Sequence, residues 1–564
     1  MSKYVLSFAL AFSIATSSKT FNSKAIVHPE VGKHGMVVSQ HYLATDVGHE
    51  ILSAGGNAYD ASIAVAFALA VVLPRAGNIG GGGFMVMHDQ ALNQNFTIDY
   101  RETAPHEASR DMYLNEDGTV NKLRATQGVL AIGVPGTVYG MWEVHQKFGS
   151  LPWRQLIEPS IKLAEQGFLM SPFMADALNG RYKKLSGFKE FSKIFYKEYP
   201  VKMRRNLKQT ELGETLKRIA KHGADGFYKG KTAQLISSYM KRHGGLITLK
   251  DLEQYRPIWR DPVEGQYRDF KVVTMGPPSS GGIHIIQMLN VLENYNLKSL
   301  GHNSPTYTAL LTEVMKHAYA DRSKYLGDPD FFNVPVDALT SKAYSQKIFN
   351  KIKLDEITPS DLIYPGEGLG HESMDTTHFS VADKHGNLVS NTYTLNSGFG
   401  SGVVINGTGV LMNNEMDDFA SAPGVPNQFG LLGGEANKIE PLKRPLSSMT
   451  PTLIFLNGKP ILATGSPGGS RIITAVLQFI LNSLDFEMEI SDATIAPRIH
   501  HQWKPDILLL EHGFDVLHAQ TIESMGQKVR ISGPGTSLES IEIKNDLIYG
   551  FGDTRRPDSK AKGL

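Results

Sequence analysis

Thr376 is the residue whose type and setting could do chemistry in this chain, within Asp375-Thr-Thr-His378. A threonine hydroxyl becomes a useful nucleophile only when a neighbouring group takes its proton. Cutting the peptide bond before Thr376 would supply such a base, because an α-amine has a pKa near ~8 and is partly neutral at physiological pH. The same hydroxyl could attack the carbonyl of Asp375 and cleave the chain. Seen alone, these four residues favour the ordinary start of a β-strand over a catalytic site.

The elements that would position Thr376 are a loop and a hairpin. Residues 355–375 are polar and glycine-rich and have no apolar period, which predicts a loop. Residues 377–382 and 388–395 then alternate across a turn at 383–387, which predicts a β-hairpin. The junction suits self-cleavage, since the loop can strain the bond while the strand fixes the threonine.

Helical and strand patterns alternate through the rest of the chain. We predict helices at 58–73, 153–166, 250–255 and about 470–484, and strands at 84–88, 96–100, 452–455 and 460–464. Thr248 is the expected N-cap of the third helix. These patterns indicate mixed α and β content and do not define a topology.

Composition excludes several classes of function. The 564 residues suggest two to four domains, and a net charge of +1 provides no field that would attract nucleic acid. The chain has no cysteine, which excludes disulfides, thiol catalysis and cysteine-based metal sites. Adjacent His500 and His501 would point to opposite faces of a strand, and no HExxH spacing occurs, so we expect no metal.

The N-terminus has the pattern of a secretory leader. Lys3 precedes an apolar stretch at residues 4–15, and small polar residues follow it. The stretch is too short to span a bilayer comfortably. We therefore expect residues 1–24 to be removed as a leader, with no membrane anchor left and a periplasmic or secreted protein. A buried N-terminal helix is the less favoured alternative.

A set of motifs resembles the γ-glutamyltransferases (glutathione hydrolases), members of the N-terminal-nucleophile hydrolases. In chain order they are Gly77-Asn-Ile-Gly-Gly-Gly-Gly-Phe84, Ile98-Asp-Tyr-Arg-Glu-Thr-Ala-Pro105, Gly276-Pro-Pro-Ser-Ser-Gly-Gly282, Asp375-Thr-Thr-His-Phe-Ser-Val-Ala-Asp383, Asn413-Asn-Glu-Met-Asp-Asp-Phe419, Arg444-Pro-Leu-Ser-Ser-Met-Thr-Pro451 and Gly465-Ser-Pro-Gly-Gly-Ser-Arg471. Each motif alone is weak to moderate. The resemblance rests on their order and completeness, from about residue 25 to the C-terminal tail.

The resemblance implies catalytic roles for four residues. Thr376 would be the nucleophile of both self-cleavage and acyl transfer, and Thr394 would orient its hydroxyl. Backbone N–H groups of Gly468 and Gly469, just before a predicted helix, would stabilise the oxyanion. Without the family, Thr394 would be interpreted as an ordinary strand residue.

The resemblance also implies a pocket with both signs of charge, because a γ-glutamyl donor carries an α-carboxylate and an α-ammonium. The residues that would bind the carboxylate are Arg101, Ser447 and Ser448. Those that would accept hydrogen bonds from the ammonium are Asn396, Glu415 and Asp418. Seen alone, Arg101 would be interpreted as a surface ion pair, and Glu415 and Asp418 as a solvated turn.

Two further features lie near this pocket in the sequence. Phe429 stands where the family usually has a tyrosine in a mobile lid, and a phenyl ring can cover the acyl-enzyme but cannot donate a hydrogen bond. Glu435 stands where aspartate is common. The run from Gly80 to Gly83 lacks the Lys-Ser/Thr of a phosphate-binding loop, so we expect it to pack tightly near the pocket.

The fold implied by the resemblance is α+β, a four-layer αββα sandwich. Residues 25–375 would form a large subunit and residues 376–564 a small catalytic subunit. The two would remain a heterodimer, because the family's sheets take strands from both sides of the cut. No cofactor is required.

The function implied is hydrolysis of glutathione or another γ-glutamyl compound, or transfer to an amino-acid or dipeptide acceptor. An acylase of glutaryl or β-lactam side chains and a poly-γ-glutamate transpeptidase are alternatives of the same architecture. The ammonium-binding set argues against a glutaryl donor. A non-enzymatic binding protein would be preferred only if Thr376 or Thr394 were missing.

Overall fold

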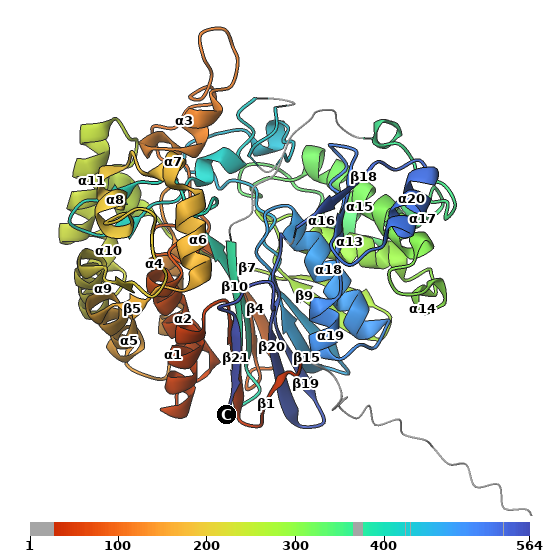
Figure 1. The fold of residues 1–564 in the computed structure, drawn as a ribbon, viewed down its shortest axis with the longest axis horizontal. Helices are drawn as coiled ribbons and strands as arrows, with labels where there is room; N and C mark the ends of the chain where they lie inside the picture. Colours follow the sequence, from red (N-terminus) through yellow and green to blue (C-terminus); the bar gives the residue numbers. More distant parts are fainter. Residues whose placement is uncertain (1–26, 365–375, 423–424, 429, 534) are drawn as a thin grey trace, which may run out of the picture.

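Two seven-stranded sheets are stacked at the centre of the computed structural model (Figure 1). The structure describes residues 27–364, 376–422, 425–428, 430–533 and 535–564. The predicted leader, Asp375 and Phe429 lie outside the described residues.

The first sheet is antiparallel throughout and contains the predicted hairpin. Its strands, in spatial order, are β21 (Lys560–Gly563), β2 (Gly35–Ser39), β10 (Thr376–Asp383), β11 (Leu388–Thr394), β3 (Gly82–Asp89), β4 (Gln94–Asp99) and β7 (Ile258–Arg260). The hairpin β10–β11 is central, and its register places Thr376 opposite Thr394.

The second sheet is also antiparallel. Its order is β1 (Glu30–Gly32), β20 (Leu547–Gly552), β19 (Glu539–Lys544), β15 (Lys459–Thr464), β14 (Thr452–Leu456), β9 (Phe270–Thr274) and β8 (Val263–Tyr267). Both sheets combine strands from before and after the 375–376 bond. Separating the two segments would therefore expose the core of each sheet.

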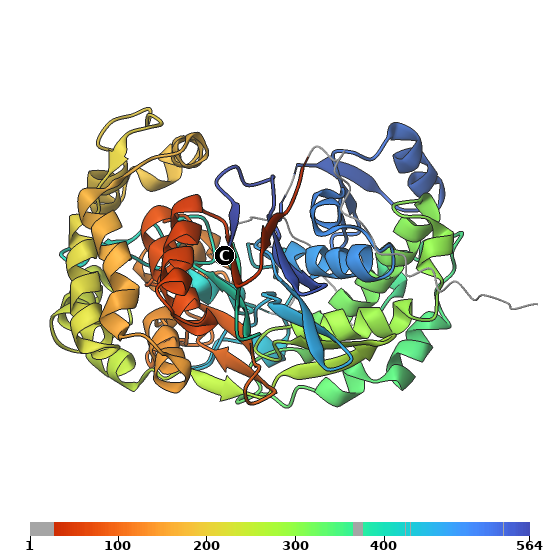
Figure 2. The same cartoon turned by 90° about the horizontal axis from the view of Figure 1, so that it is seen from below.

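Helices cover the outer face of each sheet (Figures 1 and 2). One layer contains α1 (Tyr42–Ser53), α2 (Ala58–Val72), α4 (Thr137–Phe148), α5 (Trp153–Gln166), α9 (Thr210–His222) and α11 (Gly230–His243). The other contains α13 (Gly281–Leu292), α15 (Pro305–Tyr325), α17 (Lys342–Phe349), α18 (Arg471–Leu484), α19 (Ile490–Ile495) and α20 (Val516–Ser524). The expected four-layer αββα sandwich is confirmed.

Shorter elements connect these layers. The helices are α3 (Lys122–Thr126), α6 (Pro172–Gly180), α7 (Tyr182–Leu185), α8 (Lys189–Phe195), α10 (Asp225–Tyr228), α12 (Leu249–Gln254), α14 (Leu297–Leu300) and α16 (Val336–Thr340). The strands are β5 (Phe168–Leu169), β6 (Asn206–Leu207), β12 (Val404–Ile405), β13 (Val410–Leu411), β16 (Ile499–His500), β17 (Leu508–Glu511) and β18 (Val529–Ser532).

The predicted helix boundaries are set by local capping chemistry. Asn57 and Asp60 form a capping box at the start of α2, whose residues are all buried. Thr248 and Asp251 form the same arrangement before α12, so that helix begins one residue earlier than predicted. In the described part of the chain, no helix has the length and apolar character needed to span a membrane.

Candidate active site

Thr376 begins β10 at the end of the central hairpin. Its Oγ1 donates a hydrogen bond to Oγ1 of Thr394 at 3.3 Å, and the Thr394 oxygen also accepts from the backbone N–H of Asn396 at 2.8 Å. Thr376 is 8% exposed and lines a pocket. Thr394, the predicted partner on the neighbouring strand, is therefore hydrogen-bonded to the candidate nucleophile.

The pocket beside Thr376 gathers residues that lie far apart in the sequence, from Arg101 to Ile472. Its lining is Arg101, Arg322, Thr376, Thr394, Asn396, Glu415, Asp418, Leu431, Ser447, Ser448, Met449, Gly469 and Ile472. Every described site residue predicted from the sequence is in this lining except Gly468, the neighbour of Gly469. The resemblance thus indicated a group of residues that the fold brings together.

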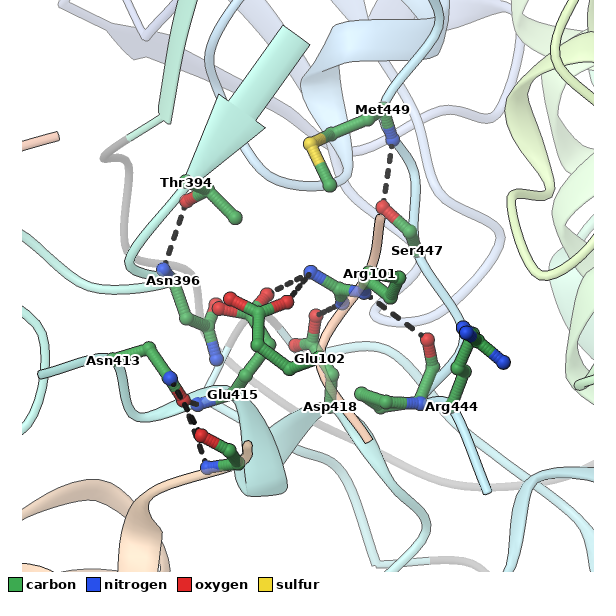
Figure 3. A network of polar contacts seen from close by, with 12 residues as sticks. Arg101, Glu102, Thr394, Asn396, Asn413, Glu415, Asp418, Arg444, Ser447 and Met449 are labelled. Atoms are coloured by element: carbon green, nitrogen blue, oxygen red, sulfur yellow. Dashed lines mark hydrogen bonds and ion pairs between the residues drawn. The ribbon is translucent and has the colours of Figure 1, made fainter. Parts of the chain in front are cut away.

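Arg101 lies at the centre of the charge network beside the pocket (Figure 3). Its Nη1 donates to Glu415, its Nη2 donates to Asp418 at 2.5 Å, and its Nε donates to the carbonyl of Pro445 at 3.2 Å. Burial acts to lower the pKa of Arg101, but the carboxylates of Glu415, Asp418 and Glu102 outweigh it and raise the pKa. A surface ion pair is therefore the wrong interpretation of Arg101.

The two predicted ammonium-binding carboxylates are bonded to Arg101, and Glu415 is fully buried while the Asp418 side chain is 10% exposed. Burial raises the pKa of Glu415 and of Asp418, although Arg101 opposes both shifts. Burial likewise raises the pKa of Glu102 to about 8, and an oxygen of Glu102 lies 3.6 Å from Arg101. A solvated turn is thus the wrong interpretation of Glu415 and Asp418. Arg101 thus pairs with Glu415 and Asp418, whereas Oε2 of Glu415 and both carboxylate oxygens of Glu102 have no hydrogen-bond partner among the described residues.

Two asparagines fix the backbone around these charges. Asn396 has a left-handed φ of 74°, and its side chain donates to the carbonyl of Asn414 at 3.0 Å. The amide of Asn413 donates to the carbonyls of Gly80 and Gly133 at 2.8 and 2.9 Å and accepts from the N–H of Glu415 at 3.0 Å. Sequence reasoning gave Asn413 no role, although it lies within a quoted motif.

The glycine run packs directly behind Thr394, as predicted. A Cβ on Gly81 would lie 2.0 Å from the carbonyl oxygen of Thr394, and one on Gly83 would lie 2.4 Å from that of Thr392. The absence of side chains therefore lets β3 approach β11.

Gly468 and Gly469 precede α18, where the helix start is electropositive. Their φ angles are 134° and 56°. A Cβ on Gly468 would lie 2.7 Å from Cγ2 of Thr536, so the backbone passes where only glycine fits. This position suits the predicted role as donors to an oxyanion.

Arg322 of α15 is a site residue that sequence reasoning missed. Its Nη2 donates to Oγ of Ser448 at 3.2 Å and its Nε donates to Oγ of Ser280 at 3.0 Å. Burial lowers the pKa of Arg322 to about 10. Its helical spacing from Met315 and Tyr319 was the available signal, because it places Arg322 on the apolar stripe of α15 that faces the core.

Thr394→Val should lower kcat for acyl transfer by about 10- to 100-fold, whereas Thr394→Ser should stay within a few-fold of wild type. Valine keeps the shape but removes the acceptor for Thr376 and leaves the Asn396 N–H unpaired, at a cost of about 1–3 kcal/mol. Steady-state kinetics of both variants would check this. Equal kcat in the valine and serine variants would contradict an orienting role.

The chain is similar to known proteins over most of its length. The family model described as Gamma-glutamyltranspeptidase matches residues 44–563. A glutathione hydrolase proenzyme of Escherichia coli K12 is 47% identical over 542 residues, which cover 95% of this chain and 93% of the relative.

Solved structures show the same fold. The cephalosporin acylase of Bacillus halodurans aligns with a TM-score of 0.86 at 25% identity, covering 98% of this chain and 99% of that one. The γ-glutamyltranspeptidase of Helicobacter pylori aligns with a TM-score of 0.57 at 46% identity, covering 59% of this chain and 96% of that one.

Proposed function

This chain belongs to the γ-glutamyltranspeptidase family, and on that premise we propose that it is an exported precursor of a γ-glutamyltransferase and glutathione hydrolase. It cuts itself before Thr376 and then uses Thr376 to carry the γ-glutamyl group. The observation that carries the proposal is the position of Thr376: its hydroxyl is bonded to Thr394 at the edge of a pocket that holds both signs of charge.

Self-cleavage begins with the Thr376 hydroxyl, because no α-amine exists before the cut. Its oxygen attacks the carbonyl carbon of Asp375, the C–N bond breaks, and the nitrogen takes the proton to become the α-amine. Water then hydrolyses the ester and leaves a carboxylate on Asp375. Thr394 holds the attacking oxygen during this step.

In acyl transfer the new α-amine takes the proton of the Thr376 hydroxyl as the oxygen attacks the γ-carbonyl. The N–H groups of Gly468 and Gly469 stabilise the negative oxygen, and the loss of one such donor typically costs ~3 kcal/mol. The amine leaving group departs with the proton. Water, an amino acid or a dipeptide then releases the γ-glutamyl ester.

Donor binding is an exchange of ion pairs. The donor's α-carboxylate replaces Glu415 and Asp418 on Arg101, with Ser447 and Ser448 adding hydroxyl donors, and the donor's ammonium takes the released carboxylates and Asn396. The internal pairs in Figure 3 are the same charges satisfied without a donor. A ligand that lacks the α-carboxylate would leave Arg101 without a partner, and one that lacks the ammonium would leave Glu415 and Asp418 without one.

We propose further that residues 1–24 are removed on export to the periplasm or medium. Residues 25–375 and 376–564 remain together, supported by the mixed origin of both sheets. The covering of the acyl-enzyme by Phe429 stays a prediction from the sequence.

Glutathione should be hydrolysed with a kcat/KM at least ~100-fold above that of a glutaryl analogue that lacks only the α-amino group. The analogue leaves Glu415 and Asp418 without a cation in a buried site, which costs several kcal/mol. Release of the cysteinylglycine product from each compound measures the ratio.

The opposite preference would support an acylase, the activity in the name of the Bacillus halodurans structure. A processed, folded protein that hydrolysed neither compound would refute both enzymatic functions.

A further inference from the structure

His378 lies two residues after the candidate nucleophile, on the side of β10 that faces the second sheet. Alternate residues of a strand share one face, so Thr376, His378 and Ser380 point the same way. The Oγ of Ser380 donates to the carbonyl of Glu539 in β19, across the gap between the sheets, at 2.8 Å. The His378 side chain is fully buried in this gap.

The hydrogen bonds of His378 define its tautomer. Nε2 lies 3.1 Å from Oγ of Ser380, and Nδ1 lies 2.8 Å from Oγ1 of Thr392. Because the Ser380 hydroxyl donates to Glu539, it must accept from the ring, so Nε2 carries the proton. Burial lowers the pKa of His378 to about 3, so the ring is neutral and Nδ1 accepts from Thr392. Both ring nitrogens are therefore committed.

The ring also presses against Gly465. A Cβ on Gly465 would lie 2.4 Å from Cε1 and 2.5 Å from Nδ1 of His378. Gly465 does not have a left-handed φ, so its glycine is required by this contact and not by backbone strain. It follows β15 and begins the loop that leads to Gly468 and Gly469.

The far side of that loop is held as well. The Oγ of Ser466 accepts from the N–H of Ser537 at 3.2 Å, and Gly468 packs against Thr536. The loop that carries the candidate oxyanion donors is thus bounded by residues 536–537 on one side and by His378 on the other.

We infer that His378 is a positioning residue, which sets the distance between the nucleophile strand and the oxyanion loop through its contact with Gly465. The inference rests on the proposed function of Thr376, Gly468 and Gly469. A neutral ring with both nitrogens engaged has no lone pair to offer as a general base. Its effect must come from geometry, and a misplacement of about 1 Å can cost about 100-fold in rate.

His378→Ala should lower kcat for γ-glutamyl hydrolysis about 10- to 100-fold while KM for the donor stays within about twofold, because the zwitterion-binding residues lie elsewhere in the pocket. A γ-glutamyl boronate, which becomes tetrahedral on Thr376, should lose affinity by the same factor as kcat. His378→Gln should keep kcat within about tenfold of wild type, since its amide can still donate to Ser380. All assays use protein whose self-cleavage has gone to completion.

The contact itself is tested by a double mutant. Gly465→Ala should also lower kcat, because its methyl group collides with the ring. In His378→Ala/Gly465→Ala the methyl group enters the vacated space, so the double mutant should be no slower than the slower single mutant. If the fold-losses in kcat of the two single mutants multiply in the double mutant, the inference is overturned.

His88→Ala is the matched control. His88 is also buried and faces the second sheet, where its ring packs edge-on against Phe455 of β14, at the end of β3 far from Thr376. Its kcat should remain within about twofold of wild type. A wild type without γ-glutamyl hydrolysis would overturn the proposed function and this inference together. An active wild type with an unaffected His378→Ala would overturn this inference alone.

Discussion

Thr376→Ala should remain one uncut chain and show no γ-glutamyl hydrolysis, with a loss in kcat of at least ~10⁴-fold. The variant lacks the oxygen that attacks Asp375 and so forms neither the new α-amine nor the ester. Intact-mass spectrometry of the wild type should show a fragment that begins at Thr376. The fragment contains 189 of the 564 residues, and this third of the chain's 62.0 kDa is about 21 kDa. That fragment should be absent from the variant.

Thr377→Val is the control for Thr376→Ala. Thr377 is fully buried on the opposite face of β10, and its hydroxyl has no hydrogen-bond partner among the described residues. Valine has nearly the same shape, so this variant should be cut and active. A folded wild type that stays whole, or a Thr376→Ala protein that is still cut at the same bond, would contradict the mechanism.

The hairpin and helix caps could be predicted from the sequence because local interactions define them. The turn at 383–387 separates two alternating runs, and Thr248 bonds to a residue only three positions away. The sheet order could not be predicted in this way. β21 pairs with β2 across more than five hundred residues, and no local pattern encodes that partner. The four-layer arrangement therefore depended on the resemblance.

The sequence predicted a separate role for each site residue, and the structure adds the contacts between these residues. The sequence assigned Arg101 and Glu415 to opposite ends of a donor, but only the fold shows that they bond to each other. Arg322 and His378 escaped prediction for a related reason. Each acts through a contact with a distant segment, Ser448 in one case and Gly465 in the other. Helical spacing can indicate that Arg322 is buried, but it cannot reveal which distant segment a side chain contacts.

Arg101→Lys should raise KM for a γ-glutamyl donor about 100-fold while changing kcat less than about tenfold. Lysine keeps the charge but loses the planar fork that bonds Glu415, Asp418 and the Pro445 carbonyl. The loss of about two charge-assisted hydrogen bonds to the donor's carboxylate corresponds to about 3 kcal/mol. Steady-state kinetics with glutathione would measure the change. A neutral residue in place of Arg101 would be less informative. The carboxylates of Glu102, Glu415 and Asp418 would then lack their cation, and the fold would be weakened.

A donor whose α-carboxylate is converted to an amide tests whether Arg101 acts on that group. The wild type should bind it poorly, and Arg101→Lys should add little to that loss, because both changes remove the same interaction. Arg110→Lys is the matched control. Arg110 forms an ion pair with Glu435 at 3.1 Å, does not line the pocket, and should leave KM within about twofold. If the losses in binding free energy from the amide donor and from Arg101→Lys add fully, the donor's carboxylate binds another cation. Arg322, which is bonded to Ser448 in the same pocket, would then be the first candidate.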